Sequence, residues 1–359
     1  MDFMKNMLPC RYLLIAMLAV LLMQTIILPG TAEERRVFVD SAGRQVILPA
    51  SVNRIAPSGQ LAQIVLYSLC PLKLIGWSSK PGDALKTYLP EPMQNLPVFG
   101  QFYGRNVSLN LEALIAAKPD VIIDIGERKA AIREDMDSIS AQTGIPVVFI
   151  EATLDTMGKA YEMLGSLTGM ESKAGELASY ARETVEEAKR SSSAIGYGKR
   201  VHVYYAEGNN GLMTDPSGSI HADVIDLVGA VNVADIALGG GAGMNPVSME
   251  QVMLWQPDVI LFAPGSAYEA AAADPLWQEL TAMKKGRYYE IPGEPYNWLG
   301  RPPAVNRLLG VKWLGSLLYP DVYKYDMVAE AQKFFKLFYH YDLSYEQAEK
   351  LMEHSTIRR

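Results

Sequence analysis

The sequence predicts an α/β fold of two lobes, each with a mostly parallel central sheet flanked by helices, joined by a long helical connector. A short sequence motif occurs twice, as KPDVII at 118–123 and as QPDVIL at 256–261. The stretch between the two copies, 154–195, holds no strand-like run and repeats apolar residues at helical spacing. At 359 residues the chain is long enough for two hydrophobic cores.

These observations divide the chain into four parts. We expect a signal peptide at 1–32, an N-terminal α/β lobe at 33–153, a helical connector at 154–195, and a C-terminal α/β lobe with terminal helices at 196–359.

The N-terminal segment is typical of a secretory signal. Lys5 and Arg11 supply positive charge, an apolar run follows over 12–30, and the small residues after it predict cleavage behind Ala32. We therefore expect export to the periplasm. An uncleaved membrane anchor is the alternative, because the apolar run approaches the roughly 17 residues that span a bilayer. Cleavage leaves Cys70 as the single cysteine, in a context that predicts burial.

The first lobe is predicted to begin with a hairpin and then to alternate strands and helices. The alternating runs of 36–50 surround Ala42-Gly43 and indicate a β-hairpin. We then expect strands at 54–56, 72–76, 121–123 and 145–150, and helices at 61–69, 111–114 and 130–143.

Apolar spacing also predicts the helices and strands of the connector and of the second lobe. Residues 154–195 predict two helices placed end to end, with a bend between Gly169 and Ser172. We then expect strands at 200–205 and 259–261, and helices within 218–229 and at 249–252, 304–318, 327–340 and 344–354.

The repeated Pro-Asp unit predicts where a ligand binds. Proline ends the helix before it, and the short β-branched runs after it indicate buried parallel strands. Ligands of such sheets bind beyond the carboxyl ends of the strands, where the loops gather. We therefore expect a cleft between the lobes.

Aromatic and arginine side chains in these loops are the candidate ligand contacts. The guanidinium of Arg301 suits carboxylate, phosphate or other oxyanions. For Arg301 the alternative is an ion pair with a neighbouring carboxylate, and for Trp298 it is anchoring of the loop in the core. The complete set of candidates is Trp77, Tyr103, Arg105, Glu207, Met244, Tyr296, Asn297, Trp298 and Arg301.

Several functions are disfavoured by composition and motifs. A formal charge of −7 argues against nucleic acid, and four histidines are too few for a zinc or manganese site built from imidazoles, although His221 is a candidate ligand. The glycines near 240 lack the Lys-Ser/Thr of a phosphate-binding loop. A secreted hydrolase is the alternative of a different class. Asp124, Asp215 and Glu207 would supply its carboxylates, but no nucleophile motif is present, so we expect no enzyme and no cofactor.

Four stretches carry a resemblance to a known family. RRVFVDSAGRQVILP with NRIAP, LEALIAAKPDVII, and VSMEQVMLWQPDVILF occur in the order and spacing of the solute-binding proteins of ABC importers for iron–siderophores, haem, cobalamin and related metal complexes. The resemblance covers essentially the whole mature chain. This family has no fixed set of ligand residues.

The resemblance implies a monomeric, rigid clamp that closes modestly and delivers its cargo to an inner-membrane permease with its ATPase. It implies an Fe(III)–siderophore as cargo, with haem, cobalamin, or a molybdate or tungstate oxyanion as alternatives. An acidic residue of each lobe would dock on permease arginines: Asp223 in the second lobe, and Glu91 or Glu112 in the first. Each is also explained as a helix-start carboxylate favoured by the helix dipole.

Overall fold

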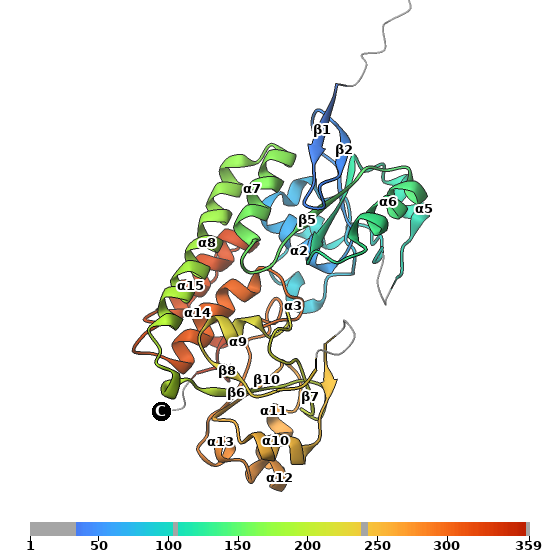
Figure 1. Cartoon of the computed structure of the whole chain (residues 1–359). Coiled ribbons are helices and arrows are strands. Elements are labelled where there is room, and N and C mark those ends of the chain that lie inside the picture. Colours follow the sequence, from blue (N-terminus) through green and yellow to red (C-terminus); the bar gives the residue numbers. More distant parts are fainter. Residues whose placement is uncertain (1–33, 103–106, 238–242, 357–359) are drawn as a thin grey trace, which may run out of the picture.

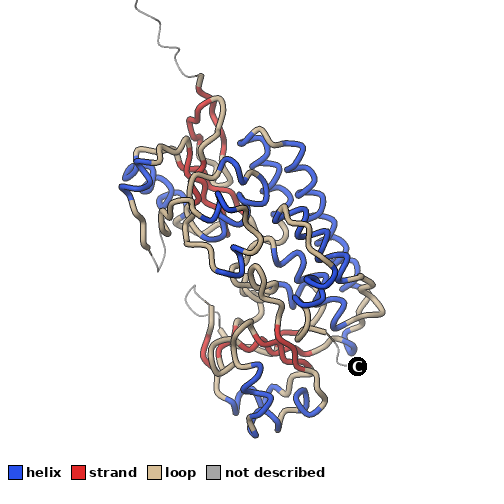
Figure 2. Tube along the Cα trace, turned by 180° about the vertical axis from the view of Figure 1, so that it is seen from behind, coloured by secondary structure: helices blue, strands red, loops and turns tan. Residues whose placement is uncertain are grey.

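The computed structural model describes residues 34–102, 107–237 and 243–356, and it contains two lobes along a helical back (Figures 1 and 2). The first lobe holds a parallel sheet in the order β3 (Ile55–Pro57), β4 (Val121–Gly126), β5 (Val147–Glu151). The second holds a parallel sheet in the order β11 (Tyr288–Glu290), β10 (Val259–Phe262), β6 (His202–Ala206), β8 (Val231–Asn232). The predicted fold class is confirmed.

Two antiparallel pairs accompany the sheets. The predicted hairpin forms from β1 (Arg35–Val39) and β2 (Gln45–Pro49). A second pair joins β7 (Met213–Thr214) to β9 (Asn245–Pro246) in the second lobe, and the sequence did not predict it.

The prediction of a strand at 72–76 is wrong. Pro71–Lys73 form a 3₁₀ turn, η1, and only Leu74 bridges to Ile55 at the sheet edge. The physical reason is Pro71, because proline at the first position of a helical turn fixes a helical φ.

Helices cover both sheets and build the back of the molecule. The first lobe carries α2 (Gln60–Leu69), α3 (Asp83–Lys86), α4 (Glu91–Gln94), α5 (Leu111–Ala116) and α6 (Ile132–Thr143). The connector holds α7 (Met157–Thr168) and α8 (Glu171–Ser193), followed by the 3₁₀ turn η2 (Tyr197–Lys199). The second lobe carries α9 (Asp223–Leu227), α10 (Met249–Trp255), α11 (Tyr268–Ala273), α12 (Pro275–Gln278) and α13 (Thr281–Lys284). The last segment forms α14 (Asn306–Leu318), α15 (Met327–Phe334), the π-helical turn η3 (Phe335–Tyr339) and α16 (Tyr345–Leu351).

The repeated Pro-Asp unit has the same structure in both lobes. The Asp120 carboxylate accepts the backbone N–H of Arg54 (2.8 Å), at the entrance of β3. The Asp258 carboxylate accepts the backbone N–H of His202 (2.9 Å), at the entrance of β6. Each aspartate therefore joins the start of its own strand to the start of the neighbouring one, and this shared role explains the repeat.

The connector differs from its prediction, because α7 and α8 pack side by side as an antiparallel hairpin rather than end to end (Figure 1). Gly169 ends α7 in the left-handed conformation (φ 69°), which reverses the chain. Gly165 of α7 lies against Ala174 of α8, and Arg182 of α8 pairs with Glu162 of α7 at 2.6 Å.

Helix α8 and the C-terminal helices hold the two lobes together. α8 packs on α2 in the first lobe and on α9 and α14 in the second. Tyr339 of η3 lies against Tyr67 of α2 in the first lobe, and Phe338 of η3 lies against Tyr161 of α7 in the connector. One continuous hydrophobic core runs through both lobes. This packing favours a stiff clamp with little relative movement of its halves.

The described residues include no helix long and apolar enough to cross a bilayer. The predicted signal segment, 1–32, lies outside them.

Candidate ligand-binding site

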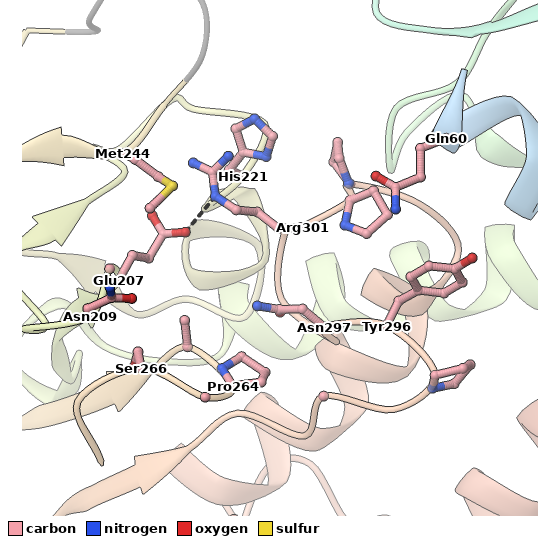
Figure 3. Close-up of a pocket in the computed structure, with 17 residues that line it drawn as sticks. Gln60, Glu207, Asn209, His221, Met244, Pro264, Ser266, Tyr296, Asn297 and Arg301 are labelled. Atoms are coloured by element: carbon pink, nitrogen blue, oxygen red, sulfur yellow. Dashed lines mark hydrogen bonds and ion pairs between the residues drawn. The ribbon is translucent and has the colours of Figure 1, made fainter. Parts of the chain in front are cut away.

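A cavity of about 710 Å³ opens between the two lobes. Gln60, at the start of α2, supplies the first-lobe wall, and segments that follow β6, β10 and β11 supply the rest (Figure 3). The cavity therefore lies beyond the carboxyl ends of the parallel strands, as expected for such sheets. Its lining residues are Gln60, Glu207, Gly208, Asn209, His221, Met244, Ala263, Pro264, Gly265, Ser266, Gly293, Pro295, Tyr296, Asn297, Arg301, Pro302 and Pro303.

A buried ion cluster forms the second-lobe wall. The Nε of Arg301 donates to Glu207 Oε1 at 2.5 Å, and its Nη2 donates to Asp215 Oδ2. Both acidic side chains are almost fully buried (1% and 0% exposed), whereas the Arg301 side chain is 26% exposed. A Cβ at Gly243 would collide with Asp215 and Arg301, so this position requires glycine. The alternative predicted for Arg301, pairing with a carboxylate, is therefore observed, and the residue also lines the cavity.

Burial perturbs the titration of this wall. The pKa of Glu207 is raised to about 7: desolvation is the largest cause, Arg301 opposes it, and the neighbouring Asp215 carboxylate adds to the rise. Desolvation also lowers the pKa of His221, and the positive charge of Arg301 adds to this effect. The imidazole is thus neutral at pH 7. Its Nδ1 lies 2.8 Å from the carbonyl oxygen of Gly300 and donates to it.

Asn297 fixes the loop that precedes α14. Its Oδ1 accepts the backbone N–H of Leu299 (2.7 Å), and its Nδ2 donates to the Tyr205 hydroxyl (3.3 Å). These bonds hold the loop against β6. Gly300 has no room for a side chain, because a Cβ there would overlap the backbone carbonyl of His221.

The first-lobe wall is the N-terminus of α2. Gly59 caps this ten-residue helix without a side-chain hydrogen bond, and its first turn contains no acidic residue. The free N–H groups and the helix dipole give this end a partial positive charge of roughly half an elementary unit. On the opposite wall, the buried hydroxyl of Ser266 has no hydrogen-bond partner within the described part of the chain.

The structure brings together five of the predicted ligand contacts. Glu207, Met244, Tyr296, Asn297 and Arg301 all line the cavity. The predictions for Tyr103 and Arg105 fall outside the described residues.

The two predicted tryptophans do not line the cavity. Trp77 is 1% exposed, and its indole N–H donates to the carbonyl oxygen of Met93 (2.7 Å). Trp298 is fully buried, and its indole N–H donates to the carbonyl oxygen of Glu294 (2.9 Å). Both rings anchor loops in the core, which is the alternative that the sequence left open for Trp298.

Sequence reasoning missed part of the second-lobe wall. Residues 263–266, 293–295 and Asp215 did not enter the set of ligand contacts, and Asp215 appeared only as a hypothetical hydrolase carboxylate. The signal for 263–266 was present, because this loop directly follows the second copy of the repeated strand. Asp215 and Glu207 do meet, whereas Asp124 lies in the first lobe and accepts the Ser58 hydroxyl.

The predicted docking carboxylates differ in accessibility. Glu91 and Glu112 are exposed at the first turns of α4 and α5. Asp223 instead accepts Nη1 of the fully buried Arg307 at 2.5 Å, and desolvation raises its pKa to about 6. The Asp223 side chain is 29% exposed and compensates an internal charge, so any docking through it would compete with its pair to Arg307, and its docking role stays a prediction.

Comparisons with known proteins agree with this architecture. The sequence profile described as "Periplasmic binding protein" matches residues 86–295. The molybdate-binding protein MolA of Haemophilus influenzae is 25% identical over 333 residues, which cover 85% of this chain and 91% of that protein. The Fe(3+) dicitrate-binding periplasmic protein FecB of Escherichia coli is 28% identical over 206 residues, 56% of this chain and 64% of that one. A solved ABC transporter solute binding protein from Sulfurospirillum deleyianum superimposes with a TM-score of 0.82 at 30% identity, covering 89% of this chain and 99% of that chain.

Proposed function

Because the chain belongs to the periplasmic binding protein family and is the solute-binding component of an ABC importer, we propose that it captures a small tetrahedral oxyanion such as molybdate or tungstate. The anion would bind in the cavity between the lobes. Proteins of this class deliver their solute to a membrane permease that works with an ATPase, and they perform no chemistry on it.

The observation that carries the proposal is the N-terminus of α2 at the cavity wall, which has no side-chain cap. Backbone N–H groups at a helix start, without an acidic neighbour, form a natural site for an oxyanion. The wall opposite Gln60 adds Arg301, His221 and the hydroxyl of Ser266, which has no hydrogen-bond partner among the described residues. Oxyanions accept hydrogen bonds only. The Arg301 guanidinium and the Ser266 hydroxyl are donors, whereas the neutral His221 ring, whose Nδ1–H donates to Gly300, would donate through Nε2 only after protonation. MolA, which aligns over most of the chain, is named for binding molybdate.

The lining disfavours haem and cobalamin as cargo. Such ligands need flat apolar faces, and the two tryptophans predicted to supply them, Trp77 and Trp298, are buried in the core. Among the described lining residues, Tyr296 is the one aromatic side chain.

A compact ferric complex of a carboxylate chelator is the second candidate. The cavity volume of about 710 Å³ exceeds the needs of a single tetrahedral oxyanion and lies within the range of about 300–1,000 Å³ that is usual for larger ligands. FecB, which matches part of the chain, is named for ferric dicitrate. This candidate retains the iron complex that the sequence resemblance implied.

Calorimetric titration of the mature protein separates the two. We expect heat and one-to-one binding with molybdate and tungstate, and none with ferric citrate. Binding of ferric citrate alone would replace the oxyanion with the second candidate. Binding of neither would contradict the proposed cargo.

Two substitutions at Gln60 test the role of the helix end. Gln60→Glu places a negative charge at the cavity wall, and we expect it to weaken molybdate binding about tenfold, since charges several ångströms apart near a protein surface repel by about 1–2 kcal/mol. Gln60→Ala changes size without adding charge, and we expect less than a threefold effect. Equal effects of the two would show that the helix end does not bind the anion.

The cellular location of the protein and its docking on the permease are also proposals. We propose that the signal is cleaved after Ala32, that the mature protein is a periplasmic monomer, and that Glu91 or Glu112 docks on permease arginines. Pull-down of the permease with Glu91→Gln and Glu112→Gln would test the docking, and we expect one of them to reduce capture.

A further inference from the structure

We propose that anion capture is coupled to the uptake of one proton by the carboxylate pair of Glu207 and Asp215 beside Arg301. The inference rests on the proposed function, because it concerns the regulation of the same site. It makes acidity a determinant of which solutes the protein retains.

The charge count of the second-lobe wall motivates it. One guanidinium, that of Arg301, faces two carboxylates that are both almost completely buried. With both carboxylates ionised, the cluster carries a net charge of −1 and repels an anion that enters the cavity. One added proton makes the cluster neutral and leaves the Arg301 guanidinium with a single ionised carboxylate. The cluster then no longer repels the anion, and the guanidinium can attract it.

Glu207 is the carboxylate with room for the proton. Its Oε1 accepts from Arg301, while its Oε2 is buried and has no hydrogen-bond partner within the described part of the chain. Both oxygens of Asp215 are occupied: Oδ1 accepts the backbone N–H of Met244 (3.1 Å) and the hydroxyl of Ser219 (3.4 Å), and Oδ2 accepts from Arg301. Glu207 also lines the cavity (Figure 3). Its pKa, raised to about 7 by burial, leaves it partly protonated near neutral pH before any anion binds.

Among the other described titratable groups that face Glu207 and Asp215, only His221 could take up the proton instead. Burial raises the pKa of Tyr204 and Tyr205 on β6 far above neutrality, so both remain uncharged. His221 has a lowered pKa and is neutral, yet an entering anion would favour its protonation too.

Arg307 and Asp223, which lie behind His221, form their own pair and compensate one another. Burial raises the pKa of Asp223 to about 6, so this carboxyl is ionised above neutral pH and carries the charge that Arg307 requires. The experiment must therefore distinguish Glu207 from His221.

Calorimetry of the mature protein with sodium molybdate provides the test. Affinity is measured at pH 6 and pH 8, and proton uptake is measured from the binding heats in two buffers of different ionisation enthalpy. A group that titrates near pH 7 when free and stays protonated when the anion is bound weakens apparent affinity about tenfold from pH 6 to pH 8. It takes up about half a proton per anion at pH 7 and close to one at pH 8.

Variants assign the proton. We expect Glu207→Gln to abolish proton uptake and flatten the pH dependence, and His221→Gln to retain both. The exposed carboxylate variant Glu269→Gln serves as a matched control in the same lobe. Uptake that persists in Glu207→Gln and disappears in His221→Gln would overturn the assignment to the carboxylate pair.

The wild-type measurement decides the question even if a variant does not fold. Molybdate binding that is equally tight at pH 6 and pH 8, without proton uptake, would overturn the inference and leave the proposed function intact. No binding of molybdate or tungstate at either pH would overturn the proposed function and the inference together.

Discussion

Arg301→Met tests whether the ion cluster holds the second-lobe wall together. The substitution keeps the volume and removes the charge, so that Glu207 and Asp215, 1% and 0% exposed, lose their common counter-ion. Removing one partner of a buried pair costs about 3–5 kcal/mol, because an uncompensated charge remains inside the protein. We therefore expect the free energy of unfolding to fall by about 3–5 kcal/mol at pH 8.

Acidity should restore part of this loss. Without Arg301 the folded-state pKa of Glu207 rises further above its unfolded value, so the folded protein binds a proton more tightly than the unfolded chain. Stability is then regained as the pH falls. Urea unfolding at pH 8 and pH 5.5 measures both effects. Arg182→Met is the matched control, since its pair with Glu162 is about half exposed on both sides and is worth at most about 1 kcal/mol. Equal losses in the two variants at pH 8 would refute the reasoning.

Three further outcomes are expected. The pKa of Glu207 rises from 4.5 to about 7 on folding, so this carboxyl stabilises the folded state below pH 4.5 and loses that contribution as the pH rises through 7. Between pH 4.5 and pH 8, the free energy of unfolding of wild type, measured in urea, should therefore fall by about 3 kcal/mol relative to that of Glu207→Gln. A difference between the two proteins that does not change with pH would contradict this. Gly300→Ala should destabilise the protein by more than about 2 kcal/mol and weaken molybdate binding, because its Cβ overlaps the carbonyl of His221, whereas Gly198→Ala, in open space, should change neither. The thiol of Cys70, at the end of α2, is 2% exposed, and burial raises its pKa to about 12. It should therefore resist alkylation in the folded mature protein at pH 8, and rapid labelling would show that the end of α2 opens readily.

Local patterns predicted most of the architecture. The Pro-Asp unit specifies a helix end and a strand start within about ten residues, so both copies were predicted from the sequence alone. The relative direction of the connector helices was not predictable in this way. A helix pair has the same apolar spacing whether it runs end to end or folds back, and only the left-handed turn at Gly169 with the contacts between Gly165 and Ala174 decides.

The candidate site was predicted in outline but not in its charge balance. The loops at strand ends were identified because parallel sheets gather them at one edge. The cluster of Arg301, Glu207 and Asp215 joins residues 94 and 86 positions apart, and no sequence period reports such a contact. The orientation of Trp298 is also tertiary information, since the same loop sequence permits a ring in the cavity or in the core.

The most direct test of the central claim is anomalous diffraction at a tungsten absorption edge from crystals of the mature protein grown with tungstate. The account predicts one strong peak between the start of α2 at Gln60 and the wall formed by His221, Ser266 and Arg301. A peak on the outer surface of either lobe, or none under conditions where calorimetry shows saturation, would contradict it.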